Sequence, residues 1–149
     1  MVQVVANRET AIELERTFGA PPGAVFRAWT DPAIMVKWLA PRPYRCESAE
    51  LDVRVGGRYR IAMHNPENGN RPLVGGVYEA VEPGKRLVFT WKWENNESWQ
   101  DGSRVTVELS AVDGGTLLRL RHERLPNDKE REGHVKGWTA CLEQLGEEF

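Results

Sequence analysis

The segment NDKEREGHVKGWTACLEQLGEEF, residues 127–149, has the apolar spacing of a helix. In most of the chain before it, apolar and polar residues alternate as they do in β-strands. Apolar side chains recur in it every three or four positions, the spacing of one helix face. They are Val135, Trp138, Cys141 or Leu142, Leu145 and Phe149. Asn127 or Asp128 can cap its start, and about twenty helical residues span roughly 30 Å. We therefore predict one long C-terminal helix, long enough to cross a sheet.

Upstream of this helix, apolar and polar residues alternate in several segments, which is typical of strands with one buried face. Short turn sequences, among them NPENGN, EPGK and DGG, join many of these segments and favour an antiparallel meander. Gly75 and Gly76 interrupt one segment and predict a bend or bulge. The predicted strands are 10–18, 48–55, 58–64, 73–81, 86–94, 104–112 and 116–123.

The stretch WTDPAIMVKWLAP, residues 29–41, predicts a corner between two short helices. Asp31 suits the N-cap of the second helix, because its carboxylate can accept hydrogen bonds from unpaired backbone N–H groups. Pro32 then occupies the first helical position, where no N–H is needed, and disfavours helical geometry at Asp31. We expect Trp29 and Trp38 on the apolar inner side of this corner.

The composition is that of one ordinary globular domain, residues 1–149, with 40% hydrophobic and 28% charged residues. A net charge of -2 gives no general electrostatic footprint for nucleic acid, so we expect no nucleic-acid partner. No apolar run has transmembrane length, and the first residues lack a signal-peptide pattern, so we expect a cytoplasmic protein without membrane insertion. Cys46 and Cys141 have no partner motif and are interpreted as buried thiols of a reducing compartment. The oligomeric state stays open.

No sequence motif for catalysis, metal binding or cofactor binding is present, and none of the three is expected. His64, His122 and His134 form no pair at helical spacing, so a zinc helix is unsupported. His122 has the parity of Leu118 and Leu120, on the expected inner face of the sheet. A neutral imidazole there could bind a ligand or act as a general base. A histidine satisfied by backbone or water is the favoured interpretation.

Four motifs in this order resemble the START-like, Bet v-like (SRPBCC) superfamily, and within it the group named after the activator of the ninety-kilodalton heat-shock protein ATPase. They are VFRAWTDPAIMVKWLAP, LDVRVGGRYRIAMH, GGVYEAVEPGKRLVFTW and HVKGWTACLEQL, and the resemblance runs from about Thr10 to Leu145. It implies an α+β helix-grip fold. In that fold a curved antiparallel β-sheet wraps around a long C-terminal helix, two short helices follow the first strand, and a cavity lies between sheet and helix.

Within such a fold, apolar side chains on the inner face admit two interpretations. They fill a core, because protein interiors are close-packed, or they line a pocket, because pockets are apolar with a few polar groups. Trp29 and Trp38 would plug one end, and Trp93 and Trp99, near the polar loop 95–103, would lie at the mouth. The candidate ligand-binding residues are Trp29, Met35, Trp38, Tyr59, Ile61, Met63, Phe89, Trp91, His122, Trp138 and Leu142.

Three functions stay open at this point. Binding of a small hydrophobic or amphipathic ligand needs only the cavity and is the leading hypothesis. A co-chaperone-like role, with a heat-shock protein ATPase as partner, is implied by the resemblance alone. A cyclase-type or dehydratase-type enzyme would need paired acid and base groups, for which the inner face offers mainly Tyr59 and His122. The sequence therefore favours a non-enzymatic role.

Overall fold

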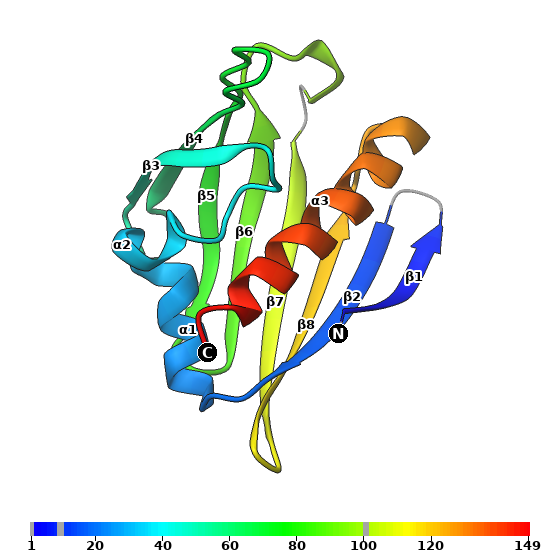
Figure 1. Ribbon diagram of the computed structural model, residues 1–149. Coiled ribbons are helices and arrows are strands. Elements are labelled where there is room, and N and C mark those ends of the chain that lie inside the picture. Colours follow the sequence, from blue (N-terminus) through cyan, green and yellow to red (C-terminus); the bar gives the residue numbers. More distant parts are fainter. Residues whose placement is uncertain (1, 9–10, 100–101) are drawn as a thin grey trace.

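Within residues 2–8, 11–99 and 102–149, which the computed structural model describes, eight strands form one antiparallel sheet and a long helix packs on one of its faces (Figure 1). The strands are β1 (Gln3–Arg8), β2 (Ala11–Phe18), β3 (Arg45–Leu51), β4 (Arg58–His64), β5 (Leu73–Glu82), β6 (Arg86–Trp93), β7 (Ser103–Val112) and β8 (Gly115–Glu123). The helices are α1 (Pro22–Thr30), α2 (Pro32–Met35) and α3 (Asp128–Gly146), with a short 3-10 helix at Glu97–Trp99.

The strand order in the sheet is β1-β2-β8-β7-β6-β5-β4-β3. The run from β3 to β8 is the predicted meander, and β2 returns to pair with the last strand, β8. Figure 1 shows α3 crossing the sheet diagonally, with its C-terminal end beside α1. The predicted α+β helix-grip fold is confirmed. Thr10, at the start of a predicted strand, and Gln100 and Asp101, in the predicted loop 95–103, lie outside the described residues.

The long C-terminal helix begins and packs as its sequence predicts. The Asn127 side chain accepts a hydrogen bond from the Glu130 N–H at 2.9 Å, which confirms this residue as the N-cap. Trp138, Leu142 and Leu145 are buried against the sheet. Phe149 is a wrong prediction, because the helix ends at Gly146 and the Phe149 side chain is 44% exposed.

Edge strands account for two differences from the sequence prediction. β1 was not predicted; its residues Val4 and Val5 are both about half exposed, so the segment lacks an alternating pattern. β3 ends at Leu51, four residues before the predicted end at Val55. A turn follows in which Gly56 has a φ of 84°, and Val55 is consequently 64% exposed.

The two central glycines of β5 allow a close backbone approach. A Cβ atom on Gly76 would lie 2.1 Å from the Thr90 carbonyl oxygen on β6, and one on Gly75 would lie 2.8 Å from the Tyr59 oxygen on β4. The predicted irregularity in this strand falls downstream of the glycines, where the β5–β6 register shifts between Tyr78 and Ala80.

The corner between α1 and α2 brings the two tryptophans together as predicted. The rings of Trp29 and Trp38 meet edge to face with centroids 4.7 Å apart, and each side chain is 1% exposed. Trp38 Nε1 donates a hydrogen bond to the Ala28 carbonyl at 3.1 Å. Trp29 also packs against Trp138 of α3, with 5.9 Å between ring centroids. The corner therefore closes one end of the space between sheet and helix.

Asp31 is the N-cap of α2, since its Oδ1 accepts a hydrogen bond from the Ala33 N–H at 2.9 Å. We expect Asp31→Ala to lower the free energy of unfolding by about 1 kcal/mol, the usual cost of a lost cap. Asp31→Asn is the matched control, because asparagine also caps and should cost much less. Urea denaturation of the three proteins measures this difference. If both variants lost the same unfolding free energy, the contribution of Asp31 would come from its ion pair with Arg27, at 3.4 Å, and not from the cap.

Candidate functional site

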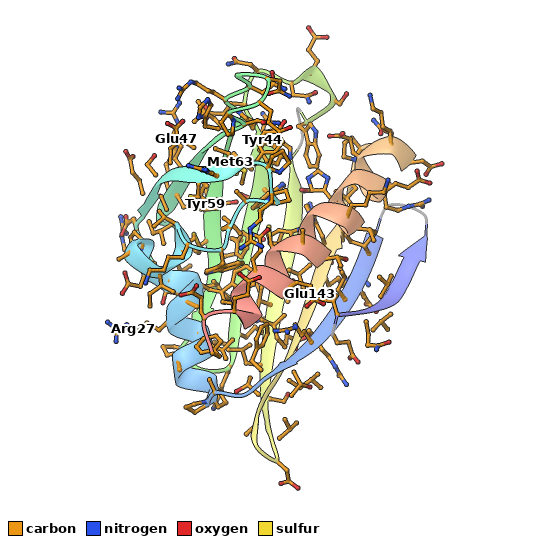
Figure 2. The ribbon with its side chains drawn as sticks, in the orientation of Figure 1. Arg27, Tyr44, Glu47, Tyr59, Met63 and Glu143 are labelled. Atoms are coloured by element: carbon orange, nitrogen blue, oxygen red, sulfur yellow. The ribbon has the colours of Figure 1, made fainter. Side chains whose placement is uncertain are left out.

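An open groove of about 440 Å³ lies between the first half of α3, the end of β6 and the segment 39–44. This volume falls within the range of small-molecule sites, about 300–1,000 Å³. Figure 2 shows the Tyr44 and Met63 side chains, which line this groove, close together and above Tyr59 in that view. The apolar lining consists of Leu39, Pro41, Tyr44, Met63, Pro72, Leu73, Trp91, Trp93, Trp138 and Cys141. The polar lining consists of Glu94, Asn95, Asn96, Glu130 and His134.

Among the described residues, the side chains in the interior beyond the groove are closely packed. A void of only about 10 Å³ remains there, which is room for about one water molecule. Seven of the eleven candidate ligand-binding residues surround it: Trp29, Met35, Tyr59, Ile61, Phe89, Trp91 and Trp138. Most of these aromatic side chains therefore pack against one another as a core.

Three of the candidate residues border the open groove: Met63, Trp91 and Trp138. Trp91 and Trp138 also line the small void, so their rings separate the two spaces. Trp38, His122 and Leu142 line neither space. Whether each candidate contacts a ligand stays a prediction.

Several groove residues were not singled out by the sequence. Tyr44 and Leu73 come from a loop and a strand start, where alternation gives no inward signal. Trp93 and Trp99 were both predicted at the cavity mouth. Trp93 lines the groove, whereas Trp99 is only 1% exposed and does not line it. Glu130 lies in the charge-rich start of α3, and the sequence pattern predicts that this part of the helix faces solvent.

Two glycines of α3, Gly133 and Gly137, line the groove one helical turn apart. Apart from its chain neighbours and the adjacent helix backbone, a Cβ atom on Gly133 would meet no described atom within 4 Å, and one on Gly137 would meet Pro41 at 3.9 Å. The helix backbone itself therefore forms part of the groove wall. Any larger side chain at these positions would project into space that is now open.

The segment 38–42, which contributes Leu39 and Pro41 to the groove lining, is fixed to α3 by Gln144. The Gln144 side chain is buried, and its Nε2 donates to the Trp38 carbonyl at 3.0 Å and to the Ala40 carbonyl at 2.8 Å. Its Oε1 accepts from the Arg42 N–H at 3.2 Å. One amide side chain thus satisfies three backbone groups of a segment without regular structure. We term this arrangement the Gln144 clamp.

His122 is fully buried, and both of its ring nitrogens have partners. Trp138 Nε1 donates to His122 Nδ1 at 3.0 Å. Because Nδ1 is an acceptor, Nε2 carries the proton and donates to Ser103 Oγ at 2.7 Å. Ser103 Oγ in turn donates to the Trp91 carbonyl at 2.8 Å. The histidine is satisfied by Ser103 and Trp138 rather than by backbone or water, and it has no free nitrogen for proton transfer.

A second histidine joins the groove mouth to the end of β6. Trp93 Nε1 donates to His134 Nε2 at 3.0 Å, and His134 Nδ1 donates to the Glu130 carbonyl at 2.7 Å. Trp99 Nε1 donates to Glu130 Oε2 at 2.6 Å. Two indole N–H groups from β6 and the following 3-10 helix therefore hold the start of α3.

Burial keeps both histidines neutral in the folded protein. Desolvation, with a smaller effect from His134, lowers the pKa of His122 well below its ordinary value. Desolvation also lowers the pKa of His134, against an opposing effect of its hydrogen bond to the Glu130 backbone. Burial raises the pKa of Cys141 to about 12, so this groove thiol stays protonated. The sulfur atoms of Cys46 and Cys141 form no disulfide.

These lowered pKa values predict a loss of stability as the pH falls. The unfolded chain binds protons at its histidines near pH 6.5, whereas the folded chain keeps His122 and His134 neutral. Stability that is fully present above that pH should decline below it, by up to about 1.4 kcal/mol per pH unit for each histidine. Thermal melts between about pH 7.5 and about pH 5.5 test this, a window chosen to stay above most carboxylate titration. His134→Gln should lower the slope, and a melting temperature independent of pH would contradict the prediction.

The fold defines a START-like, helix-grip protein with a largely apolar groove between its sheet and its C-terminal helix. The sequence model of the family described as "Activator of Hsp90 ATPase homolog 1-like protein" matches residues 19–149. The chain belongs to this family. The resemblance drawn from its motifs is thereby confirmed.

Solved structures of bacterial proteins share the whole fold. A protein from Chromobacterium violaceum is 31% identical, with a TM-score of 0.84 over 93% of this chain and 96% of that chain. The AHSA1 protein from Silicibacter pomeroyi is 30% identical, with a TM-score of 0.80 over 93% and 96% of the two chains.

An uncharacterised protein from Schizosaccharomyces pombe is 26% identical over 126 residues, which are 82% of this chain and 32% of that protein. The chain spans about a third of the length of that curated relative.

The described part of the chain shows neither a metal-binding cluster nor a membrane-spanning helix. Among residues 2–8, 11–99 and 102–149, no three His, Cys, Asp or Glu side chains form a group that could hold a metal ion. Over the same ranges, no helix has the length and apolarity needed to cross a membrane.

Proposed function

We propose that this protein binds a small apolar or amphipathic molecule in the groove between its sheet and its C-terminal helix. The observation that carries the proposal is the groove itself, about 440 Å³ in volume and lined by Trp91, Trp93 and Trp138. Concave sites with mostly apolar walls and a few polar groups are typical of small-molecule binding. The filled interior limits the proposed site to the groove, so a bound molecule would keep one end near solvent.

Binding is favoured over catalysis by the state of the buried polar groups. His122 has both nitrogens occupied, and the Tyr59 hydroxyl donates a short hydrogen bond of 2.5 Å to the Thr90 carbonyl. Burial raises the pKa of Tyr59 well above its ordinary value, so this phenol stays protonated. The two acid–base candidates of the inner face, Tyr59 and His122, are therefore engaged in structural contacts.

Filling the groove from the helix side tests the proposal. Gly137→Leu places a side chain in the groove, and we expect it to weaken binding of apolar ring compounds at least tenfold, because the ligand would lose most of its contact with α3. Lys136→Leu is the matched control, since Lys136 is exposed on the same helix and does not line the groove. Ligand-dependent quenching of tryptophan emission and the rise in melting temperature are the two readouts.

The outcomes of this experiment are distinct. A compound at a hundred times its dissociation constant should stabilise the parent protein by about 2.7 kcal/mol. Equal binding by both variants would place the ligand elsewhere. A broad screen of apolar compounds without quenching or thermal shift would remove the proposal.

The family description favours a second candidate, a co-chaperone-like role toward a heat-shock protein ATPase. It rests on the match over residues 19–149 and on no contact in the structure. Retention of purified Hsp90 on the immobilised chain, with stimulation of its ATPase rate, would support this role. Absence of both would leave small-molecule binding as the remaining proposal.

A further inference from the structure

We infer that the groove selects molecules whose polar end is a cation, specifically an ammonium group attached to an apolar, ring-containing body. This inference deepens the proposed binding function and depends on it. Its basis is that the charged groups lining the groove, among the described residues, are all negative, and that no cationic side chain of these residues pairs with the Glu130 carboxylate.

Among the residues that the structure describes, the charged ones lining the groove are two glutamates, Glu94 and Glu130. Within the described ranges, no lysine or arginine lines the groove. His134 borders it as a neutral ring, with a nitrogen already engaged on each side. A carboxylate or phosphate head group would therefore leave water without gaining a cationic partner, which is unfavourable.

The two glutamates differ in what surrounds them. Both carboxylate oxygens of Glu94 bind the Arg60 guanidinium, at 2.8 and 3.1 Å, so its charge is compensated. Glu130 Oε2 accepts the Trp99 indole N–H at 2.6 Å, and among the described residues Glu130 forms no ion pair within 4.0 Å. A neutral N–H group positions this carboxylate without cancelling its charge. Glu130 is therefore the counter-charge available at the groove.

The aromatic lining favours the same ligand. Trp91 and Trp138 lie with ring centroids 5.0 Å apart, and Trp91 and Trp93 with centroids 5.5 Å apart. Indole rings attract cations through their electron-rich faces and also bury apolar ring systems. The N-terminus of α3 carries partial positive charge that favours anions, but Asp128 and Glu130 in its first turn oppose that effect.

Three probes with one skeleton separate charge from apolar contact: 4-phenylbutylamine, 4-phenylbutanol and 4-phenylbutyrate. At neutral pH and low salt, isothermal titration should show the amine binding about tenfold more tightly than the carboxylate, the combined size expected of a cation–π contact and an ion pair. The alcohol should lie between them. Added salt should reduce the difference in affinity between the amine and the carboxylate, because screening weakens the charge interaction.

Two variants test the role of Glu130. Glu130→Gln keeps an oxygen for the Trp99 N–H and removes the charge, so the preference for amine over carboxylate should fall at least threefold. Glu132→Gln removes the same charge from an exposed position of the same helix and should leave the preference unchanged. Thermal melts establish that both variants are folded.

Each outcome bears on a different statement. If the carboxylate binds as tightly as the amine or more tightly, the charge inference is wrong and the proposed binding function stands. The same conclusion follows if Glu130→Gln leaves the preference for the amine unchanged. Failure of all three probes, the neutral alcohol included, contradicts both.

Discussion

Gln144→Glu should lower the free energy of unfolding by about 3–5 kcal/mol at neutral pH, because it places an unpaired charge in a buried site. The native amide donates to the Trp38 and Ala40 carbonyl oxygens at 3.0 and 2.8 Å. An ionised carboxylate offers no donor and would face these two oxygens with like partial charge. Since a whole domain is stable by only about 5–15 kcal/mol, this loss should be visible as a large fall in the urea midpoint.

The pH dependence identifies the cause of this loss. Burial and the two carbonyl oxygens should raise the pKa of the introduced carboxyl in the folded state. Its neutral form would then keep one donor, so the deficit relative to the parent protein should shrink as the pH falls and grow as the pH rises. Gln144→Met fills similar space without hydrogen bonds or charge and serves as the control; it should cost less and show no such pH dependence. An equal, pH-independent loss in both variants would contradict the clamp.

Trp138→Ala should cost about 3–5 kcal/mol of unfolding free energy, the range for removing a buried tryptophan. Trp138 is 3% exposed, and its ring packs against Trp29 of the α1–α2 corner and Trp91 of β6. Its N–H is also the donor to His122 Nδ1. Removing it therefore opens a cavity and leaves a buried acceptor without a partner.

Trp138→Phe separates these two contributions. Phenylalanine retains a ring in the aromatic cluster but has no N–H, so its cost should be about 1–3 kcal/mol, mainly the unsatisfied His122 nitrogen. A further readout is the histidine itself. With Nδ1 unpaired, protonation of His122 becomes less unfavourable, and its signal in NMR titration should shift toward a higher pKa. If Trp138→Phe were as stable as the parent protein, the hydrogen bond would contribute nothing to the fold.

Local sequence signals were reliable where a short segment determines its own structure. The caps at Asp31 and Asn127 follow from side chains that reach their own backbone N–H groups. Alternation placed Tyr59, Ile61 and Met63 of β4 on the buried face. Alternation failed at β1, an edge strand whose residues Val4 and Val5 are about half exposed, and at Val55, which lies in a glycine turn beyond the end of β3.

The candidate site was predicted less well, because sequence parity reports which face is buried and not how completely it is filled. Parity placed His122 inward, and His122 is fully buried, but its partners Ser103 and Trp138 come from another strand and from α3. The same parity could not distinguish a lining residue from a packed one. Seven of the eleven candidates therefore surround a void of about 10 Å³, while the larger space opens elsewhere.

The sequence by itself identified the family through its motifs. It also determined the order of the helices and of strands β2 to β8, the capped corner and the long helix, because these depend mainly on contacts among near neighbours in the chain. Only the tertiary structure decided where open space remains. The Gln144 clamp joins residues more than a hundred positions apart and holds one part of the groove lining, while Gly133 and Gly137 contribute helix backbone without side chains to another part. The size of a cavity is what remains after many distant side chains have packed, and no single segment encodes it.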